Sequence, residues 1–196
     1  MAPAPTTIAS YRSLTGSEDT DGRERAGRYH LISMREEATG KTGVPSETRQ
    51  KPERPRDRLG RPLAWDAVNE LELDDYDARP AEENHELGRA AVREARYFPA
   101  HEAWETAWKQ ARGTGDAEFF KGLSQMGAGY VHLQRGNAHG AITLLTRAAS
   151  RVGRYPDPHR GIATAALTAR MRADAERVRS GELVPGADAT FDPPEV

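Results

Sequence analysis

The residues best suited to chemistry are gathered in residues 97–108, which read YFPAHEAWETAW. This stretch contains His101, Glu102 and Glu105 together with two of the three tryptophans of the chain. His101 and Glu105 are four residues apart, so they share one face if the segment is helical. A neutral imidazole and a carboxylate can bind zinc, iron or manganese, and a metal-bound water could then act as a nucleophile.

Two further polar side chains could complete such a site from another helix. Gln125 and His132 are seven residues apart, which places them on one helix face. The candidate metal ligands are His101, Glu105 and His132, with Glu102 as a further ligand or a base. Helical geometry puts Glu102 about 160° from Trp104, near the opposite face, where water would solvate it unless the helix is central. The full candidate site is His101, Glu102, Glu105, Gln125 and His132.

Three interpretations of this cluster differ in the role of the polar side chains. A metal site would be incomplete on one helix, because His-x-x-x-Glu supplies two ligands and lacks the His-Glu-x-x-His pattern of zinc proteases. In a buried network, His101 and Glu105 would satisfy each other and a tryptophan indole N–H, fixing the register of the helices. The third interpretation is a groove for a peptide, an RNA or a small ligand, lined by Gln125, His132, Tyr130 and Trp108. The residue types favour the network or the groove over the metal site.

Apolar residues recur with helical spacing from residue 80 to residue 180, and no stretch alternates as a strand would. Proline, glycine and capping residues divide this region into five helices. We expect them from Pro80 to about residue 96, from Pro99 to Gly113, from Asp116 to Gly136, from Asn137 to Gly153, and from Asp157 to about Ser180. The last helix would be lined by Ile162, Ala165, Ala166, Ala169 and Ala173. The candidate packing core is Trp104, Trp108, Leu123, Met126, Tyr130 and Leu145.

A weak internal repeat appears when the chain is shifted by 41 residues, because positions 88, 100, 104 and 107 then fall on positions 129, 141, 145 and 148. Small residues would let two antiparallel helices approach, and the large one would fill the space between hairpins. We therefore predict an all-α, five-helix bundle of two tetratricopeptide-like helical hairpins plus a capping helix. The paired positions are Gly88, Ala100, Trp104 and Ala107 with Gly129, Ala141, Leu145 and Ala148.

The chain outside residues 80–180 is poor in large apolar side chains. We expect a disordered extension over residues 1–60, an acidic lead-in over 61–79 with Trp65 as its anchor, and a flexible tail over 181–196. Residues 51–62 form a basic patch, which we interpret as a solvated linker rather than an arm for RNA, because no aromatic residues interleave with the charges. Initiation at Met1 and initiation at Met34 both fit the sequence.

Composition narrows the possible functions. The net charge is −2 and there are no cysteines, which excludes disulfides, thiolate metal sites and a cysteine nucleophile. There is no strong nucleic-acid signal and no membrane-spanning run, and the first residues lack the features of a secretory signal. We expect a cytoplasmic protein whose partner is unknown, a peptide or a small ligand being possible. No Gly-x-Ser-x-Gly motif supports serine chemistry.

Residues 80–155 resemble the family called domain of unknown function 309. The resemblance rests on the aromatic residue followed by Ala-His-Glu, on Gly122-Leu123-Ser124-Gln125, and on the segment HLQRGNAHGA at 132–141. The chain departs from the family at Pro99, where members more often carry a helix former. The resemblance implies a small helical bundle, and some members are labelled predicted metal-dependent hydrolases.

Together these observations predict a small binding or structural module with a polar His/Glu network. The alternative is a metal-dependent hydrolase that uses His101, Glu105 and His132. Only this alternative requires a cofactor, a divalent transition metal.

Overall fold

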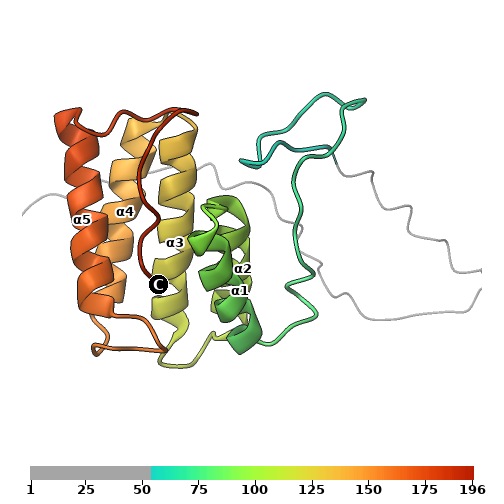
Figure 1. The fold of residues 1–196 in the computed structure, drawn as a ribbon. Helices are drawn as coiled ribbons and strands as arrows, with labels where there is room; N and C mark the ends of the chain where they lie inside the picture. Colours follow the sequence, from blue (N-terminus) through green and yellow to red (C-terminus); the bar gives the residue numbers. More distant parts are fainter. Residues whose placement is uncertain (1–53) are drawn as a thin grey trace, which may run out of the picture. The chain divides into compact units, whose positions relative to one another are not determined.

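The structure, a computed structural model, describes residues 54–196. Both candidate start residues, Met1 and Met34, therefore lie outside the described residues. So does most of the segment 1–60, which was expected to be disordered. Between residues 54 and 196 the chain forms helices and loops, with two isolated bridges and no strand. The predicted all-α, five-helix architecture is confirmed (Figure 1). The helices are α1 (Ala81–Arg93), α2 (Tyr97–Gln110), α3 (Ala117–Gln134), α4 (Ala138–Val152) and α5 (Thr164–Ser180).

Each helix packs against the helix that precedes or follows it in the chain. α1 and α2 form one hairpin, α3 and α4 form a second, and α5 packs against α4 (Figure 1). Asn137 caps α4 as its sequence position predicted, since its side chain accepts a hydrogen bond of 2.9 Å from the backbone N–H of Gly140. Helices that are neighbours in sequence are thus neighbours in space.

The structure corrects two of the predicted helix starts. α2 begins at Tyr97, so Pro99 is its third residue, where the missing N–H costs nothing because the first turn has no intrahelical acceptor. α5 begins at Thr164 rather than at Asp157, and Ile162 is buried in the loop before it. The predicted alanine stripe is wrong, because alanine is too weakly apolar to fix which face turns inward. The face that packs consists mainly of Leu167, Met171, Ala175 and Val178.

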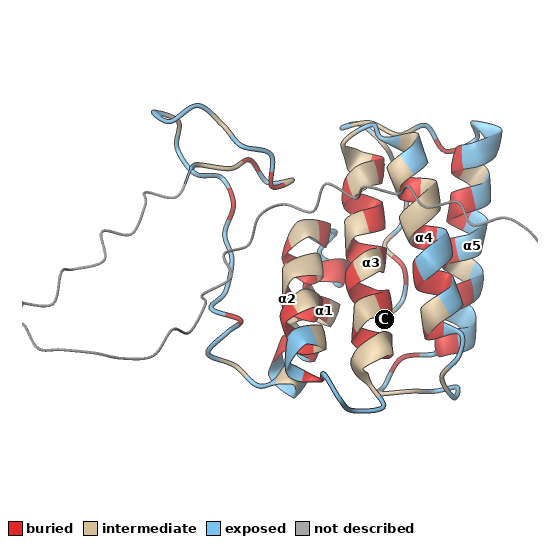
Figure 2. Ribbon diagram, turned by 180° about the vertical axis from the view of Figure 1, so that it is seen from behind, coloured by how far each residue is buried: buried red, intermediate tan, exposed pale blue. Residues whose placement is uncertain are grey.

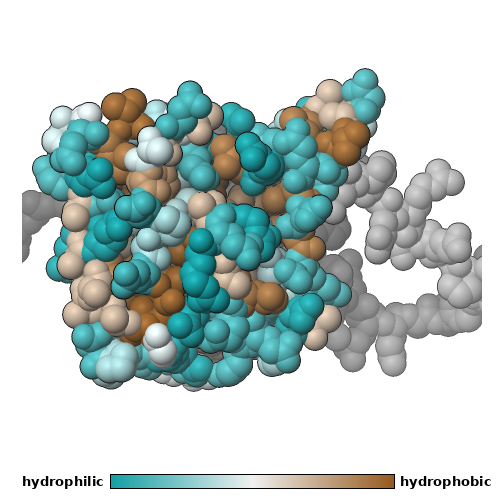
Figure 3. Space-filling model, in the orientation of Figure 1, coloured by the Kyte–Doolittle hydropathy of each residue, from teal (hydrophilic) through white to brown (hydrophobic). Residues whose placement is uncertain are grey.

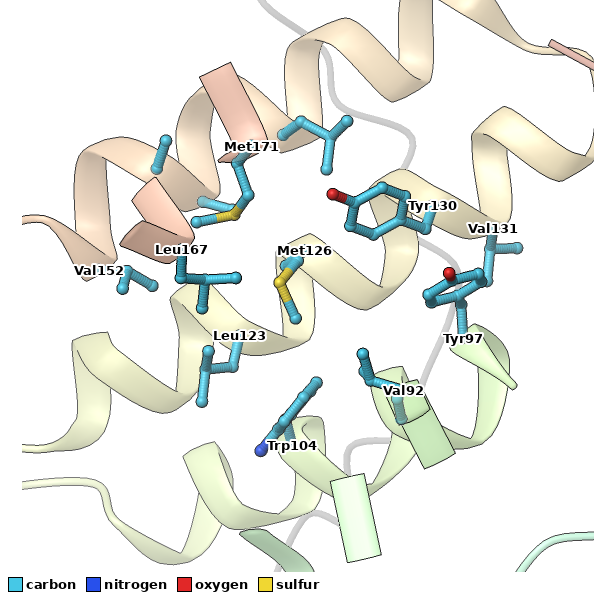
Figure 4. Packing of buried hydrophobic residues seen from close by; sticks show 14 of the residues in the cluster. Val92, Tyr97, Trp104, Leu123, Met126, Tyr130, Val131, Val152, Leu167 and Met171 are labelled. Carbon is cyan, nitrogen blue, oxygen red and sulfur yellow. The ribbon is translucent and has the colours of Figure 1, made fainter. Parts of the chain in front are cut away.

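A single hydrophobic core runs through the helices (Figure 4). Of the six residues proposed for it, five are fully shielded from solvent: Trp104, Leu123, Met126, Tyr130 and Leu145. Trp108 is only partly buried at the edge of the core. Its ring carries two cations, with Lys121 Nζ 4.8 Å and Arg112 Cζ 5.4 Å from the ring centroid. Trp108 therefore packs against the edge of the core and also interacts with two surface cations.

The repeat found by shifting the sequence corresponds to a repeated packing contact. A Cβ added to Gly88 in α1 would lie 2.6 Å from Cε2 of Trp104 in α2. At the equivalent positions, a Cβ added to Gly129 in α3 would lie 2.9 Å from Cδ2 of Leu145 in α4. In both hairpins the first helix thus offers a bare backbone to the largest apolar side chain of the second.

Residues 54–80 form an irregular lead-in whose buried apolar side chains are Leu71 and Tyr76. Trp65, the expected anchor, is 65% exposed, and Arg54 lies over its ring. The basic stretch is not a free linker in its described part, because Arg135 of α3 donates a hydrogen bond to the carbonyl oxygen of Leu59. In the lead-in, burial is thus decided by its contacts with the bundle rather than by side-chain size.

Buried residues line the inward faces of the helices, and among the helices exposed residues are most frequent on the outer face of α5 (Figure 2). On the face shown in Figure 3, hydrophobic residues form small separate patches among hydrophilic ones. Within the described residues, no helix combines the length and the apolarity required to cross a membrane.

Candidate functional site

The close approach of two helices positions the candidate site. His101 lies in α2, and its backbone faces Gly127 of α3. A Cβ added to Gly127 would lie 2.9 Å from the backbone nitrogen of His101 and 3.1 Å from its Cβ. Because Gly127 has no side chain, the His101 ring can reach the backbone of α3 directly.

The His101 ring is fixed on one side by Ser124 of α3. Nδ1 of His101 lies 3.0 Å from the carbonyl oxygen of Ser124 and 2.9 Å from its hydroxyl oxygen. The ring also meets Phe98 edge to face, with centroids 6.2 Å apart. These contacts turn the other ring nitrogen, Nε2, away from α3.

Two carboxylates face this second nitrogen. Nε2 of His101 lies 3.4 Å from Oε2 of Glu105 and 3.8 Å from Oε1 of Glu102. One ligand atom from each residue lies within 4.8 Å of the other two. The side chains of His101, Glu102 and Glu105 are 25%, 35% and 29% exposed, so solvent reaches all three. We call these three residues the α2 triad.

The two carboxylates of the triad differ in their electrostatic surroundings. Burial raises the pKa of Glu102 above its ordinary value, the nearby His101 lowers it, and the negative charge of Glu105 raises it further. Glu105 also has a cationic neighbour, because Lys109 Nζ lies 3.0 Å from its Oε1. Glu105 is therefore partly neutralised, whereas Glu102 holds its negative charge at a cost.

The hydrogen-bond chemistry of Ser124 favours one tautomer of His101. A carbonyl oxygen only accepts, so the 3.0 Å contact is a hydrogen bond when Nδ1 carries the proton, and the Ser124 hydroxyl oxygen can accept from the same N–H. In the neutral ring Nε2 then carries a lone pair, which points towards the oxygens of Glu102 and Glu105. Lone pairs facing one another repel, and a cation placed between them removes that repulsion. A metal ion bound between them would supply that positive charge.

The structure does not bring Gln125 or His132 into this cluster. Oε1 of Gln125 accepts a hydrogen bond of 2.9 Å from Arg151 of α4. Nδ1 of His132 lies 2.8 Å from the amide nitrogen of Asn137, at the start of α4. The two residues do share a face of α3, but that face contacts α4, whereas Ser124 contacts α2. The ligand set proposed from the sequence, with His132 as its third member, is therefore not assembled.

The tryptophan indole is satisfied by a residue outside the proposed network. Nε1–H of Trp104 donates to Nδ1 of His85 at 3.1 Å, and not to His101 or Glu105. Sequence reasoning also missed Ser124 and the fully buried Asp174, which accepts hydrogen bonds from Tyr130 and two arginines of α5. The signal for Ser124 was present, because Ser124 and Gly127 form a strip of small residues one helical turn apart.

The fold and the triad define a small all-α module with a polar histidine–glutamate network. Residues 86–144 match the family described as "Domain of unknown function (DUF309)", which confirms the resemblance found in the sequence. The matched region spans most of α1, all of α2 and α3, and the first half of α4. It includes the whole α2 triad and Ser124. Neither the curated proteins nor the solved structures include a match.

Proposed function

We propose that the protein is a cation-binding helical module in which the α2 triad holds one divalent transition metal. The observation that carries the proposal is the orientation of His101. Its Nδ1 is bound to the Ser124 carbonyl, which directs Nε2 at two carboxylate oxygens 3.4 and 3.8 Å away. Histidines that bind metals commonly donate their other ring N–H to a backbone carbonyl or a carboxylate, which is the arrangement here.

The donor set fits such an ion. One imidazole nitrogen and two carboxylate oxygens suit zinc, manganese or iron. The three ligand atoms lie within 4.8 Å of one another, and metal bonds of about 2.0–2.2 Å require them to move slightly closer; side-chain rotation of the partly exposed glutamates supplies that movement. A cation would also offset the cost of keeping Glu102 ionised beside Glu105.

Binding rather than hydrolysis is the function we propose. The hydrolase considered from the sequence needed His132, whose ring lies against Asn137 and α4. Three ligands from one helix leave coordination positions open to water, but the described residues around the triad offer no further feature that points to a substrate.

The test is calorimetric titration of zinc or manganese into untagged protein that has been stripped with a chelator. We expect one equivalent to bind and to raise the melting temperature. His101→Gln and Glu105→Gln should each remove both effects. Lys109→Met should instead tighten binding, because it removes the cation that competes for Glu105. His139→Gln serves as the matched control, since His139 is exposed on α4 and lies outside the triad.

Two results would overturn the proposal. One is the absence of binding at millimolar metal by a folded wild-type chain. The other is binding that His101→Gln leaves unchanged, which would place the ion at another histidine such as His159, whose Nε2 already lies 2.8 Å from Asp116.

A further inference from the structure

Residues after α5 turn back along the bundle instead of extending away from it (Figure 1). The backbone N–H of Leu183 donates to the carbonyl of Arg177, and that of Gly186 donates to the carbonyl of Leu133 at the end of α3, both at 2.9 Å. We call residues 187–196 the tail. It runs beside α3 in an irregular, extended conformation, and Figure 1 shows it in dark red.

One aromatic side chain anchors the tail. The ring of Phe191 lies nearly parallel to the rings of Tyr97 and Tyr130, with centroid distances of 5.6 and 5.4 Å. Those two tyrosines stack on each other at 5.0 Å, and Figure 4 shows them side by side at the end of the core. Tyr97 is 1% exposed and Tyr130 is fully buried, so Phe191 forms part of their cover.

The remaining direct bonds to the tail are made by arginines and reach its main chain. Arg170 of α5 donates to the carbonyl oxygen of Asp192 at 2.6 Å. Arg89 of α1 donates to the oxygen of Val196 at 3.3 Å. We call the surface that carries these contacts, formed by α1, α2, α3 and α5, the tail groove. The arginines bind main-chain oxygens, which every peptide has. The groove therefore requires only one aromatic side chain from the sequence of the segment that occupies it.

The tail occupies the groove without filling it. A hollow of about 510 Å³ remains between the tail and α5, bordered by Arg170, Arg177, Thr190 and Asp192 among others. The hydroxyl of the buried Tyr97 has no hydrogen-bond partner among the described residues. Asp188, Asp192 and Glu195 are exposed and give the tail a negative charge, opposite to that of the arginines facing it.

We propose that the tail groove is a peptide-binding site, which the tail occupies as an internal ligand. Its partner is an extended acidic peptide that carries one aromatic side chain, placed as Phe191 is in the tail. A short tether gives an internal ligand an effective concentration near the millimolar range, so the tail outcompetes a weak peptide in solution. A partner binds once the tail is released from the groove. The tail thereby sets how high the partner's affinity or concentration must be for binding.

The experiment uses the full chain and a fluorescein-labelled peptide of residues 187–196, ADATFDPPEV. Its binding is followed by fluorescence anisotropy. The Phe191→Ala substitution weakens the internal ligand, so this variant should bind the peptide with at least about tenfold higher affinity than the wild type. The reason is that apparent affinity is limited by the fraction of molecules whose groove is free of the tail. Val184→Ala is the matched control, since Val184 follows the same helix but is 70% exposed. A peptide with alanine in place of its phenylalanine should not bind.

Circular dichroism establishes that Phe191→Ala is folded, and Phe191→Leu provides a milder variant if it is not. Equal peptide affinity for the wild type and the folded variant would show that the tail does not compete and would overturn the proposal. So would the absence of binding to the variant at high micromolar peptide, or undiminished binding of the alanine peptide. None of these measurements depends on the α2 triad, so the two proposals fail independently.

Discussion

The indole Nε1–H of Trp104 donates to Nδ1 of His85 at 3.1 Å, and Nε2 of His85 lies 3.0 Å from the carbonyl oxygen of Arg160. An indole only donates and a carbonyl only accepts, so the His85 ring is neutral and carries its proton on Nε2. One imidazole thereby connects α1, α2 and the loop before α5. His85 is 4% exposed, and Trp104 is fully buried.

Replacing His85 should destabilise the fold. His85→Leu leaves the buried N–H of Trp104 and the carbonyl of Arg160 without their partner. An unsatisfied buried polar group costs roughly 1–3 kcal/mol, and we expect a loss of this size in the free energy of unfolding. Urea denaturation measures it, with His139→Leu as the exposed control. An equal effect of the two substitutions would contradict the assigned role.

His85 should also make stability depend on pH. Burial lowers the pKa of His85 below its ordinary value of 6.5, and the Arg160 carbonyl only partly opposes this. The unfolded chain therefore binds the proton first as the pH falls, and the contribution of His85 lowers the stability of the native state below about pH 6.5 with a slope of at most about 1.4 kcal/mol per pH unit.

Urea titrations at several pH values between 7.5 and 5 measure this slope. His85→Gln retains a donor and an acceptor but does not titrate, so its slope should be smaller. It should not vanish, because burial also lowers the pKa of His132. Identical slopes in the wild type and His85→Gln would refute the prediction.

The repeated glycine contacts should be intolerant of a methyl group. Gly88→Ala and Gly129→Ala would each force a Cβ to within 3 Å of a large side chain, and overpacking of this kind costs about 1–3 kcal/mol. We expect the larger cost at Gly88, because the rigid indole of Trp104 cannot yield as the Leu145 side chain can. Thermal melting compares them with Gly115→Ala, where no atom lies within 4 Å of the added Cβ. A melting temperature unchanged by Gly88→Ala would show that the hairpins do not pack so closely.

Glu102→Gln should stabilise the metal-free protein at neutral pH. Burial raises the pKa of Glu102, so its contribution favours folding at pH values below the ordinary 4.5 and is lost as the pH rises through the folded pKa. At pH 7 the ionised carboxylate is less favourable in the folded than in the unfolded chain, and glutamine removes that charge.

The same substitution should weaken the rise in melting temperature caused by zinc or manganese, because it removes one of the three ligands. Glu83→Gln, on the exposed first turn of α1, is the control for a lost helical carboxylate. A lower melting temperature of metal-free Glu102→Gln at pH 7 would show that the carboxylate is stabilised by its neighbours instead.

Much of the helical framework follows from local sequence. The apolar spacing in α3, from Phe119 through Leu123, Met126 and Tyr130, defines its inward face, and those four side chains are fully or almost fully buried. Periodicity and capping are properties of a few consecutive turns, so they can be recognised without knowing the partner helix. Where the signal was weak, as in the alanine-rich α5, the predicted face was wrong.

The composition of the candidate site depends on how each helix is rotated about its own axis, which the sequence of that helix alone does not determine. The sequence by itself determined that His101, Glu102 and Glu105 occur within two turns of one helix, since their spacing alone requires it. Only the tertiary structure decided that Ser124 meets His101, that Gln125 and His132 face α4, that His85 satisfies Trp104, and that Phe191 covers two tyrosines. The physical reason is that the contacts of Ser124, His85 and Phe191 join residues 19 to 94 positions apart, and their geometry depends on how closely small residues such as Gly127 allow the helices to approach.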